Sequence, residues 1–235
     1  MIGFMLAAGL GTRLRPLTDQ IPKCLIPIGG RPLMSYWLDL LVAHGVERVV
    51  INSHHLHEQM VTYVQSLDLP IRITLTYEPT LLGSAGTLRA NRRFADGEDD
   101  FLVVYADNLT NVNLSELFQQ HRRSAKIATL ALFRTAQPSR CGIVSLDSEG
   151  TVVEFHEKPT HPTSNLAFGG LMVASPAFLN FIPDRVPCDL GKDVLPLVLG
   201  QIAGWEVPGY LRDLGTLEDY QQAQTDLPQL QLERQ

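Results

Sequence analysis

Residues Leu6–Pro32 read LAAGLGTRLRPLTDQIPKCLIPIGGRP and directly overlap the end of a short apolar run, Ile2–Leu6. The stretch opens with small residues and glycines and then carries Arg13 and Lys23 among several prolines. Glycine lets backbone N–H groups approach an anion at positive φ, while arginine and lysine neutralise its charge. A buried strand that runs into a glycine-rich, basic turn is typical of a polyphosphate cradle. We therefore expect a nucleoside triphosphate to bind on this stretch.

The composition is that of an ordinary globular chain, with 235 residues, 45% hydrophobic and 19% charged. A net charge of −6 argues against broad nucleic-acid binding, which normally needs a basic face. Cys24, Cys141 and Cys188 are widely spaced and form no CxxC pair, which favours free thiols in a reducing compartment. No signal peptide or membrane-spanning run is recognisable. We expect a cytoplasmic protein with no membrane or nucleic-acid partner.

Hydrophobic periodicity predicts strands that alternate with helices through the first 105 residues. The expected strands are 2–6, 49–51, 71–77 and 101–105, and the expected helices are 32–41, 55–67 and 85–94. Gly45 is expected to cap the C-terminal end of the first of these helices. This alternation predicts right-handed βαβ units and a parallel sheet. Ligands of such sheets bind beyond the carboxyl ends of the strands, where Asp107 and the opening stretch are expected to lie.

A mixed β region is expected to follow. The pattern predicts helices at 114–123, 176–181, 192–199 and 217–224, strands at 126–133 and 171–174, and a hairpin of 143–146 with 152–155. We predict one domain, 1–226, with a nucleotide-binding half (1–110) and a sugar-binding half (111–226). The Gln-rich tail, 227–235, is expected to be disordered or loosely packed.

Two isolated aspartates each end a short apolar stretch, Asp107 in VVYADN and Asp213 in YLRDLG. Either residue alone fits a helix cap or a turn as well as a metal ligand. Magnesium takes only one or two carboxylates and fills its shell with water and substrate phosphates. Together, the two aspartates fit a magnesium site.

Three further charged or glycine-rich motifs could bind a ligand or have a purely structural role. Arg13 and Lys23 could be solvated surface charges, but their position in a Gly/Pro-rich loop rather than on a polar helical face favours anion binding. We treat Arg15 as an accessory. In Glu157-Lys158-Pro159, proline is expected to hold Lys158 in an extended conformation, so that the pair can contact a sugar and a phosphate. The segment LGSAGTL (82–88) fits either an anion site at a helix N-terminus or a tight strand-to-helix turn.

Together these motifs make the chain resemble the sugar-1-phosphate nucleotidylyltransferases. The resemblance rests on LAAGLGTRLRPLT…PKCLIPIGGRPL, LGSAGTL, the Asp107 strand end, EKP and RDLGTLEDY, and it spans Leu6–Tyr220. It implies a Rossmann-like three-layer α/β/α sandwich with a mostly parallel, mixed sheet, of the nucleotide-diphospho-sugar transferase type. It also implies an EC 2.7.7 transferase that joins a nucleoside triphosphate to a sugar 1-phosphate, in line and with Mg²⁺, and releases pyrophosphate.

The resemblance assigns roles to individual residues. Arg13 and Lys23 would be the catalytic pair. Arg13 would hold the β and γ phosphates, and Lys23 would stabilise the α-phosphate and the incoming sugar phosphate. The magnesium ligands would be Asp107 and Asp213. The nucleotide would be bound by Leu6, Ala7, Ala8, Gly9, Gly11, Thr12, Gly83, Gly86 and Thr87. The sugar and its phosphate would be bound by Gly142, Glu157 and Lys158.

The sequence departs from the family pattern at two places, of which the first is a mild change that should be tolerated and the second leaves the identity of the sugar open. Ala106 replaces the glycine that commonly precedes the metal aspartate, and Phe168-Gly169-Gly170 replaces Asn-Ala-Gly, which removes a polar sugar contact. The segment LLGSAGTL resembles guanylyltransferases that act on mannose or heptose 1-phosphate, so GTP is slightly favoured. Uridylyl-, thymidylyl- and cytidylyltransferases stay open, as do relatives acting on phosphocholine or N-acetylmuramate 1-phosphate.

A catalytically silent, nucleotide-sugar-binding regulatory subunit is the alternative from another class. Such a subunit should lose its charged residues, whereas Arg13, Lys23, Asp107 and Asp213 are all present here. The chain contains no coiled-coil heptads, and its sequence does not predict an oligomeric state.

Overall fold

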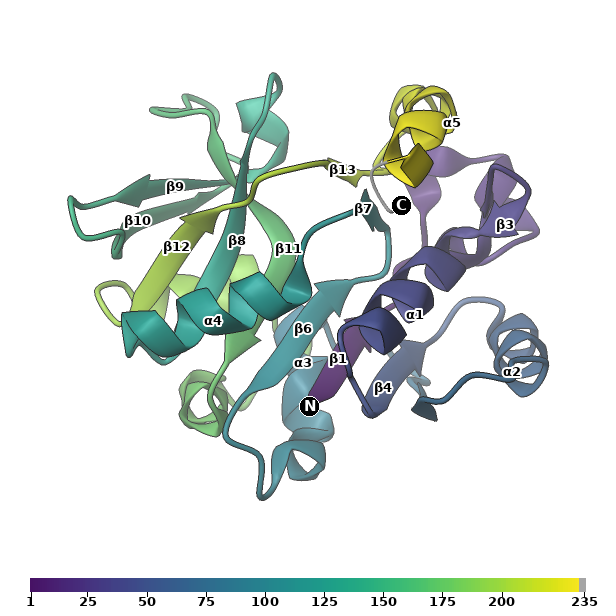
Figure 1. Ribbon diagram of the computed structural model, residues 1–235, viewed down its shortest axis with the longest axis horizontal. Helices are drawn as coiled ribbons and strands as arrows, with labels where there is room; N and C mark the ends of the chain where they lie inside the picture. Colours follow the sequence, from purple (N-terminus) through teal and green to yellow (C-terminus); the bar gives the residue numbers. More distant parts are fainter. Residues whose placement is uncertain (233–235) are drawn as a thin grey trace. The chain divides into compact units, whose positions relative to one another are not determined.

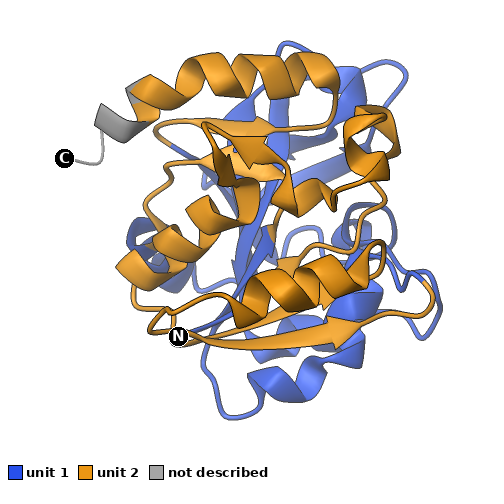
Figure 2. Cartoon of the chain, turned by 90° about the vertical axis from the view of Figure 1, so that its right-hand side faces the viewer, with its two compact units in different colours: residues 1–4, 81–104, 115–207 blue, residues 5–80, 105–114, 208–235 orange. Residues whose placement is uncertain are grey.

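The computed structural model describes residues 1–232 (Figure 1). The chain divides into two compact units, which Figure 2 colours separately. Unit 1 comprises Met1–Phe4, Leu81–Val104 and Ser115–Val207. Unit 2 comprises Met5–Thr80, Tyr105–Leu114 and Pro208–Gln235. The units interleave along the chain, and the expected nucleotide-binding and sugar-binding halves, 1–110 and 111–226, stay a prediction.

Unit 2 contains a parallel pair of strands joined by a helix. Strand β1 (Ile2–Leu6) enters this unit from unit 1. Strands β4 (Arg48–Ser53) and β5 (Arg72–Tyr77) are paired in parallel along their whole length, and α2 (His57–Gln65) connects them. The predicted alternation of strands with helices and the predicted parallel pairing are confirmed here.

Helix α1 (Leu33–Ala43) ends as the sequence predicts. Gly45 has a φ of 71° and donates its N–H to the Val42 carbonyl at 3.0 Å, while Val46 donates to the Leu41 carbonyl at 2.9 Å. These two bonds satisfy carbonyls that the last helical turn leaves unpaired. Pro32 lies one residue before the helix, as its N-cap, rather than in its first turn.

Short elements make up the rest of unit 2. They include strands that the sequence analysis missed, because runs of two or three residues carry no periodicity. The strands are β2 (Pro27–Ile28), β3 (Arg31–Pro32), β7 (Asn108–Thr110) and β13 (Leu211–Asp213). The 3₁₀ helices are η1 (Thr12–Leu14), η2 (Leu17–Asp19) and η3 (Lys23–Leu25).

The expectation of a loose tail from Leu227 is wrong for the residues that the structure describes. Helix α5 runs from Leu217 to Leu232, and Ala223, Leu227 and Leu230 are buried. These residues share one helical face because they are three or four positions apart. They join a cluster that includes Leu14, Ile28, Leu33, Leu109 and Leu214. Because glutamines separate these apolar residues, the sequence did not indicate an apolar helical face here. Residues 233–235 of the predicted tail lie outside the described part of the chain.

Unit 1 is built around a mixed sheet. Strands β10, β9, β11 and β6 follow one another in antiparallel order, β8 also pairs with β11, and β12 runs parallel to β8. The strands are β6 (Phe101–Tyr105), β8 (Ala128–Arg134), β9 (Gly142–Leu146), β10 (Val152–Glu157), β11 (Leu166–Ala174) and β12 (Ile202–Glu206). The α/β class with a mixed sheet is confirmed.

The predicted hairpin between β9 and β10 is confirmed. Asp147 and Thr151 close it through a 2.9 Å backbone hydrogen bond, and Gly150 has a φ of 79°. The Asp147 carboxylate accepts the N–H groups of Glu149 and Thr151 at 2.9 and 2.8 Å, as an aspartate does in a tight turn.

The helices of unit 1 include one that confirms the prediction at 114–123 and several that are shorter or less regular than expected. They are α3 (Ser84–Ala90), α4 (Leu114–Ser124), the 3₁₀ helices η4 (Arg92–Ala95), η5 (Pro138–Arg140), η6 (Pro176–Phe181) and η8 (Leu195–Leu197), and the π-helical turn η7 (Leu190–Val194). The predicted helix 192–199 is broken because Pro196 lacks an N–H to continue it. Among residues 1–232, no helix combines the length and the apolar character that a bilayer crossing needs.

Candidate active site

Lys23 lies at the centre of a charged cluster in unit 2. It is the first residue of η3, and its side chain is only 9% exposed. Its ammonium Nζ lies 2.5 Å from Oδ2 of Asp107 and 3.5 Å from Oδ1 of Asp213. The structure therefore brings together three residues that the sequence predicts for catalysis and metal binding.

Asp107 and Asp213 lie close together because two short strands pair. Strand β13 is antiparallel to β7, with Asp213 opposite Asn108. Leu214 donates its N–H to the Asp107 carbonyl at 3.0 Å. The indole of Trp37 donates to the Asn108 carbonyl at 2.7 Å. The two aspartates are thus positioned by backbone hydrogen bonds and by a helix packed beneath them.

Electrostatic coupling within this cluster shifts two pKa values. Burial by itself would lower the pKa of Lys23, but the charges of Asp107 and Asp213 outweigh it, so the pKa is raised and the ammonium stays protonated. The pKa of Asp213 is raised by burial and then by repulsion from Asp107, against the opposing attraction of Lys23 and Arg13. The site therefore holds closely spaced charges of both signs.

Arg13 reaches the same cluster from the opening stretch. It lies in η1 and is exposed. A Cβ on Gly215 would lie 3.3 Å from Nη1 of Arg13 and 2.9 Å from Oδ2 of Asp213. Gly215 therefore leaves the room that both charged groups occupy. Gly215 belongs to the RDLGTLEDY motif but is not among the site residues predicted from the sequence.

The two aspartates fit a magnesium ion. Within residues 1–232, no group of three or more His, Cys, Asp and Glu side chains forms a metal site. Magnesium does not require one, because it usually binds one or two carboxylates and keeps water or phosphate oxygens as its other ligands. The repulsion that raises the pKa of Asp213 is the kind that a divalent cation between two carboxylates relieves.

The turn after β1 needs glycine at one position and is open at another. Gly11 has a φ of 63°, and a Cβ there would lie 2.8 Å from Cγ2 of Thr18 and 3.2 Å from Cβ of Lys23. Thr18 also donates its hydroxyl to the Gly11 carbonyl at 2.8 Å. A Cβ on Gly9 would meet no atom within 4 Å, so a ligand can approach the backbone there. Of the other predicted residues of this turn, Ala8 is buried and Thr12 is exposed.

Residues that the sequence analysis missed hold the start of this turn. Ala7 donates its N–H to Oδ1 of Asn52 at 2.6 Å, and Asn52 donates from Nδ2 to Oε1 of Glu78 at 2.8 Å. Leu6 accepts the N–H of Ala106 at 3.0 Å, which places the two predicted segments side by side within unit 2. The buried polar pair Asn52 and Glu78 carried no sequence signal beyond its place at two strand ends.

Glu157, Lys158 and Gly142 lie together in unit 1. Glu157 and Gly142 are opposite each other in the β10–β9 ladder. Oε2 of Glu157 lies 3.0 Å from the Cβ position of Gly142 and 2.6 Å from that of Gly191, so both glycines make room for the carboxylate. Nζ of Lys158 lies 3.1 Å from Oε1 of Glu157. Gly191 is a further residue that sequence reasoning missed.

The expected extended conformation of Lys158 is wrong. Its φ is 47°, in the left-handed region, and its N–H donates to the Cys141 carbonyl at 3.0 Å. Proline disfavours mainly the right-handed helical conformation in the residue before it, and the contacts with Cys141 and Glu157 favour the left-handed one.

The glycine-rich segment 82–88 in unit 1 makes a tight turn at Gly83 and continues as the first residues of α3. Ala85 and Gly86 both donate their N–H groups to the Cys188 carbonyl at 3.0 Å, and a Cβ on Gly83 would overlap the Cys188 backbone. Thr87 is buried and donates its hydroxyl to Gly83. The two N–H groups are therefore occupied and do not form an anion site. The assignment of Gly83, Gly86 and Thr87 to the nucleoside stays a prediction.

Comparison with known proteins places these features among nucleotidyltransferases. Residues 2–229 match the family described as nucleotidyl transferase. The chain is 30% identical over 226 residues to "Mannose-1-phosphate guanylyltransferase catalytic subunit beta" of Xenopus tropicalis, covering 94% of this chain and 62% of the relative. It is 33% identical over 241 residues to "UTP--glucose-1-phosphate uridylyltransferase" of Synechocystis, covering 95% and 62%. The chain thus spans about 62% of the length of these relatives.

A solved structure has the same fold. The crystal structure of HddC from Yersinia pseudotuberculosis complexed with GMP-PN matches with a TM-score of 0.81 at 20% identity, covering 96% of this chain and 99% of that one. The similarity confirms the predicted fold class, the Rossmann-like α/β fold with a mixed sheet.

Proposed function

Because the chain belongs to the nucleotidyl transferase family, we propose that it transfers a nucleoside monophosphate from a nucleoside triphosphate to a sugar 1-phosphate and releases pyrophosphate. The observation that carries the proposal is the contact of Lys23 with Asp107 and Asp213. A buried ammonium between two carboxylates supplies a fixed positive charge and a place for a divalent cation. Both are required where several phosphate groups react.

The chemistry needs positioning and charge neutralisation. An oxygen of the sugar phosphate attacks the α-phosphorus, and the bond from that phosphorus to the departing pyrophosphate breaks in line. The attacking oxygen is already ionised at neutral pH, so no general base is required. In this proposal Lys23 binds the α-phosphate, where negative charge develops, and Arg13 binds the β and γ phosphates of the leaving group.

Asp107 and Asp213 would hold Mg²⁺ in this proposal. When bound, the ion supplies positive charge against the phosphate oxygens. Because Lys23 pairs with both aspartates, a divalent cation that binds them would compete with the ammonium. Lys23 would then be free to pair with a phosphate oxygen.

For the substrates, we favour GTP with mannose 1-phosphate or heptose 1-phosphate. The LLGSAGTL segment and the similarity to a mannose-1-phosphate guanylyltransferase support this choice. The similarity to a UTP–glucose-1-phosphate uridylyltransferase keeps UTP with glucose 1-phosphate as the second candidate. Glu157 and Lys158 would bind the sugar and its phosphate. The three free cysteines support a cytoplasmic location.

The test is pyrophosphate release with Mg²⁺ across a panel of GTP, UTP, dTTP and CTP, each with several sugar 1-phosphates. Arg13→Ala is compared with Arg15→Ala, because Arg15 is exposed and pairs with Asp19 at 3.1 Å rather than with the cluster. We expect release that is fastest with GTP, is lost in Arg13→Ala and is kept in Arg15→Ala. Tight nucleotide-sugar binding without release from any pair would favour the silent regulatory subunit instead.

A further inference from the structure

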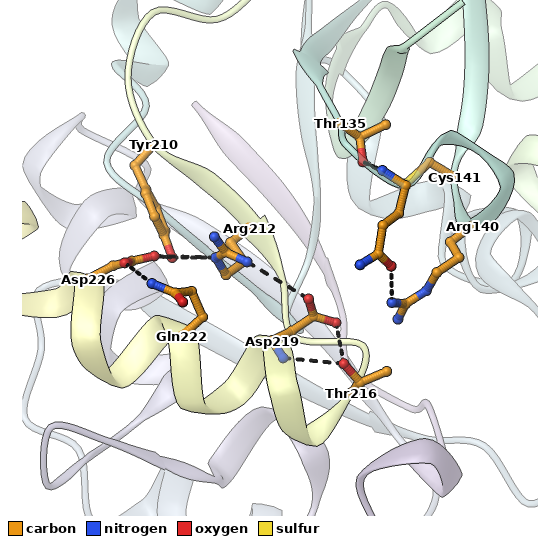
Figure 3. Close-up of polar contacts among 10 residues, drawn as sticks. Thr135, Arg140, Cys141, Tyr210, Arg212, Thr216, Asp219, Gln222 and Asp226 are labelled. Atoms are coloured by element: carbon orange, nitrogen blue, oxygen red, sulfur yellow. Dashed lines mark hydrogen bonds and ion pairs between the residues drawn. The ribbon is translucent and has the colours of Figure 1, made fainter.

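Arg212 stands next to the proposed metal ligand Asp213 in β13 but engages a different set of partners. Its Nε donates to the Tyr210 hydroxyl at 2.9 Å and lies 3.4 Å from Oδ2 of Asp226, and its Nη1 lies 3.8 Å from Oδ1 of Asp219. Figure 3 shows the guanidinium between the strand and helix α5. Arg212 thus links β13 to two acids, about two turns apart, on one helix.

The partners of Arg212 are themselves held in place. The Asp219 carboxylate accepts the Thr216 hydroxyl at 2.6 Å, at the start of α5. The Asp226 carboxylate accepts the Tyr210 hydroxyl at 2.8 Å and the Gln222 amide at 2.7 Å (Figure 3). A guanidinium that meets carboxylates already fixed by other hydrogen bonds loses little further freedom when it pairs with them.

The carboxylate of Asp226 in this network stays ionised although burial favours its neutral form. Burial alone would raise the pKa of Asp226, but hydrogen bonds from Gln222 and Tyr210 and the charge of Arg212 lower it. Burial and the hydrogen bond to Asp226 raise the pKa of Tyr210, so the phenol remains a donor. The network therefore keeps its ion pairs at neutral pH.

The geometry of β13 connects this network to the site. Successive side chains of a strand point to opposite faces, so Arg212 faces α5 while Asp213 faces Lys23. Strand β13 has three residues and pairs with β7. A strand this short gains few backbone hydrogen bonds of its own, and its position depends on what lies on its other side. Thr110 and Asn111 hold the backbone of Tyr210, just before the strand, and Arg212 adds the ionic contact of the strand itself with α5.

We infer that Arg212 is a positioning residue: by binding Asp219 and Asp226 of α5 it fixes β13, and thereby holds Asp213 where a divalent cation can bind. The inference rests on the proposed function for the assignment of Asp213 as a metal ligand. Loss of Arg212 should weaken metal binding while leaving the sugar-phosphate residues of unit 1 intact.

The test uses Arg212→Gln and Arg212→Lys, with Arg31→Gln as a matched control. Arg31 lies in the same unit, pairs with Asp39 at 2.8 Å and stands 5.0 Å from the Tyr36 ring centre, much as Arg212 stands 5.8 Å from that of Tyr210. Binding of Mn²⁺ alone to the full chain is followed by electron paramagnetic resonance. The Mg²⁺ dependence of pyrophosphate release and the KM for sugar 1-phosphate are measured separately.

We expect Arg212→Gln to weaken Mn²⁺ binding, and to raise the Mg²⁺ concentration for half-maximal release, by about tenfold. The KM for sugar 1-phosphate should stay within about twofold of its wild-type value, because a positioning effect on Asp213 does not reach that substrate. Arg212→Lys keeps the positive charge but not the planar guanidinium that can pair with two carboxylates. Its Mn²⁺ affinity should therefore lie between those of the wild type and Arg212→Gln. Arg31→Gln should behave as wild type.

Unchanged Mn²⁺ binding and Mg²⁺ dependence in Arg212→Gln would overturn the inference. If that variant does not fold, Asp226→Asn removes one partner, leaves Asp219, and should shift metal binding in the same direction. Absence of both Mn²⁺ binding and pyrophosphate release in the wild-type chain would overturn the proposed function itself, which is a different result.

Discussion

The ammonium nitrogen of Lys23 lies 2.5 Å from a carboxylate oxygen of Asp107, although 84 residues separate them along the chain. Oδ1 of Asp213 lies 3.5 Å from the same nitrogen. The three side chains come from separate segments of unit 2, and the β7–β13 ladder brings the two aspartates to adjacent positions.

Lys23→Ala should lower kcat by about a hundredfold to a thousandfold, as loss of one fixed charge at a reacting phosphate does. The melting temperature should change far less than turnover, because the side chains of Asp107 and Asp213 are 32% and 47% exposed and water can solvate them. Pyrophosphate release and thermal unfolding measure the two effects. Lys126→Ala, a half-buried lysine of unit 1 whose ammonium donates to the Gly200 carbonyl, is the control. Near-normal turnover in Lys23→Ala would contradict the assignment.

Gly11→Ala should lower the free energy of unfolding by about 2–3 kcal/mol, because alanine is strained at positive φ and its Cβ would contact Thr18. Gly30→Ala is the matched control, with a φ of 80° and no atom within 4 Å of the added Cβ. Gly30→Ala should lower the free energy of unfolding only by the backbone strain at positive φ, about 1 kcal/mol. Urea unfolding measures both. Adding Thr18→Ser to Gly11→Ala removes the clashing methyl and should recover part of the loss.

Gly191→Ala should displace the Glu157 carboxylate, whose Oε2 lies 2.6 Å from the new Cβ position. We expect the KM for sugar 1-phosphate to rise by about tenfold, as when a charged hydrogen bond is lost. The KM for the nucleoside triphosphate should not change. Gly200→Ala, whose Cβ would meet no atom within 4 Å, is the control. Equal effects on both KM values would show that the glycine serves folding rather than the sugar site.

Cys24 should not react with a thiol reagent at pH 8 in the folded protein. Burial raises the pKa of its thiol to about 12, so only about one molecule in ten thousand carries the thiolate at that pH. Cys188 is also buried, whereas Cys141 is only half-buried. Titration with Ellman's reagent should therefore modify Cys141 in the native protein and all three cysteines after denaturation. Rapid modification of Cys24 before unfolding would contradict its burial.

Leu227→Ala should lower the free energy of unfolding by about 2–3 kcal/mol, because it removes a buried side chain from the cluster beneath α5. Leu217→Ala is the matched control in the same helix, since Leu217 is 38% exposed. Denaturant unfolding compares the two. Equal stability of the two variants would restore the expectation of a loose tail.

Local sequence patterns predicted much of the fold. β1 and β6 begin and end where periodicity placed them, and the αL glycine Gly45 ends α1 as expected. Such elements depend on interactions within a few residues, which a sequence contains in full. The three-residue strand β13 depends on its partner β7, about a hundred residues earlier, and no local pattern predicts it.

Lys158 and Gly191 likewise have conformations or contacts that depend on residues distant in the sequence. The backbone of Lys158 is left-handed, and its N–H donates to the carbonyl of Cys141, which precedes β9 on the other side of the hairpin. Gly191 matters only because Glu157 comes within 2.6 Å of its missing side chain. Cys141 is too far from Lys158 in the sequence, and Glu157 too far from Gly191, for either contact to be predicted from a local pattern.

By itself the sequence determined which chemical groups this protein carries: the glycine turn, Arg13 and Lys23, and two aspartates at strand ends. Those choices follow from residue type and local spacing, and they were sufficient to identify the family. Only the tertiary structure decided that Lys23 is buried against both aspartates and that Arg212 ties Asp213 to α5. Charges interact according to their distance in space, and folding alone brings positions so far apart in the chain to within a few ångströms.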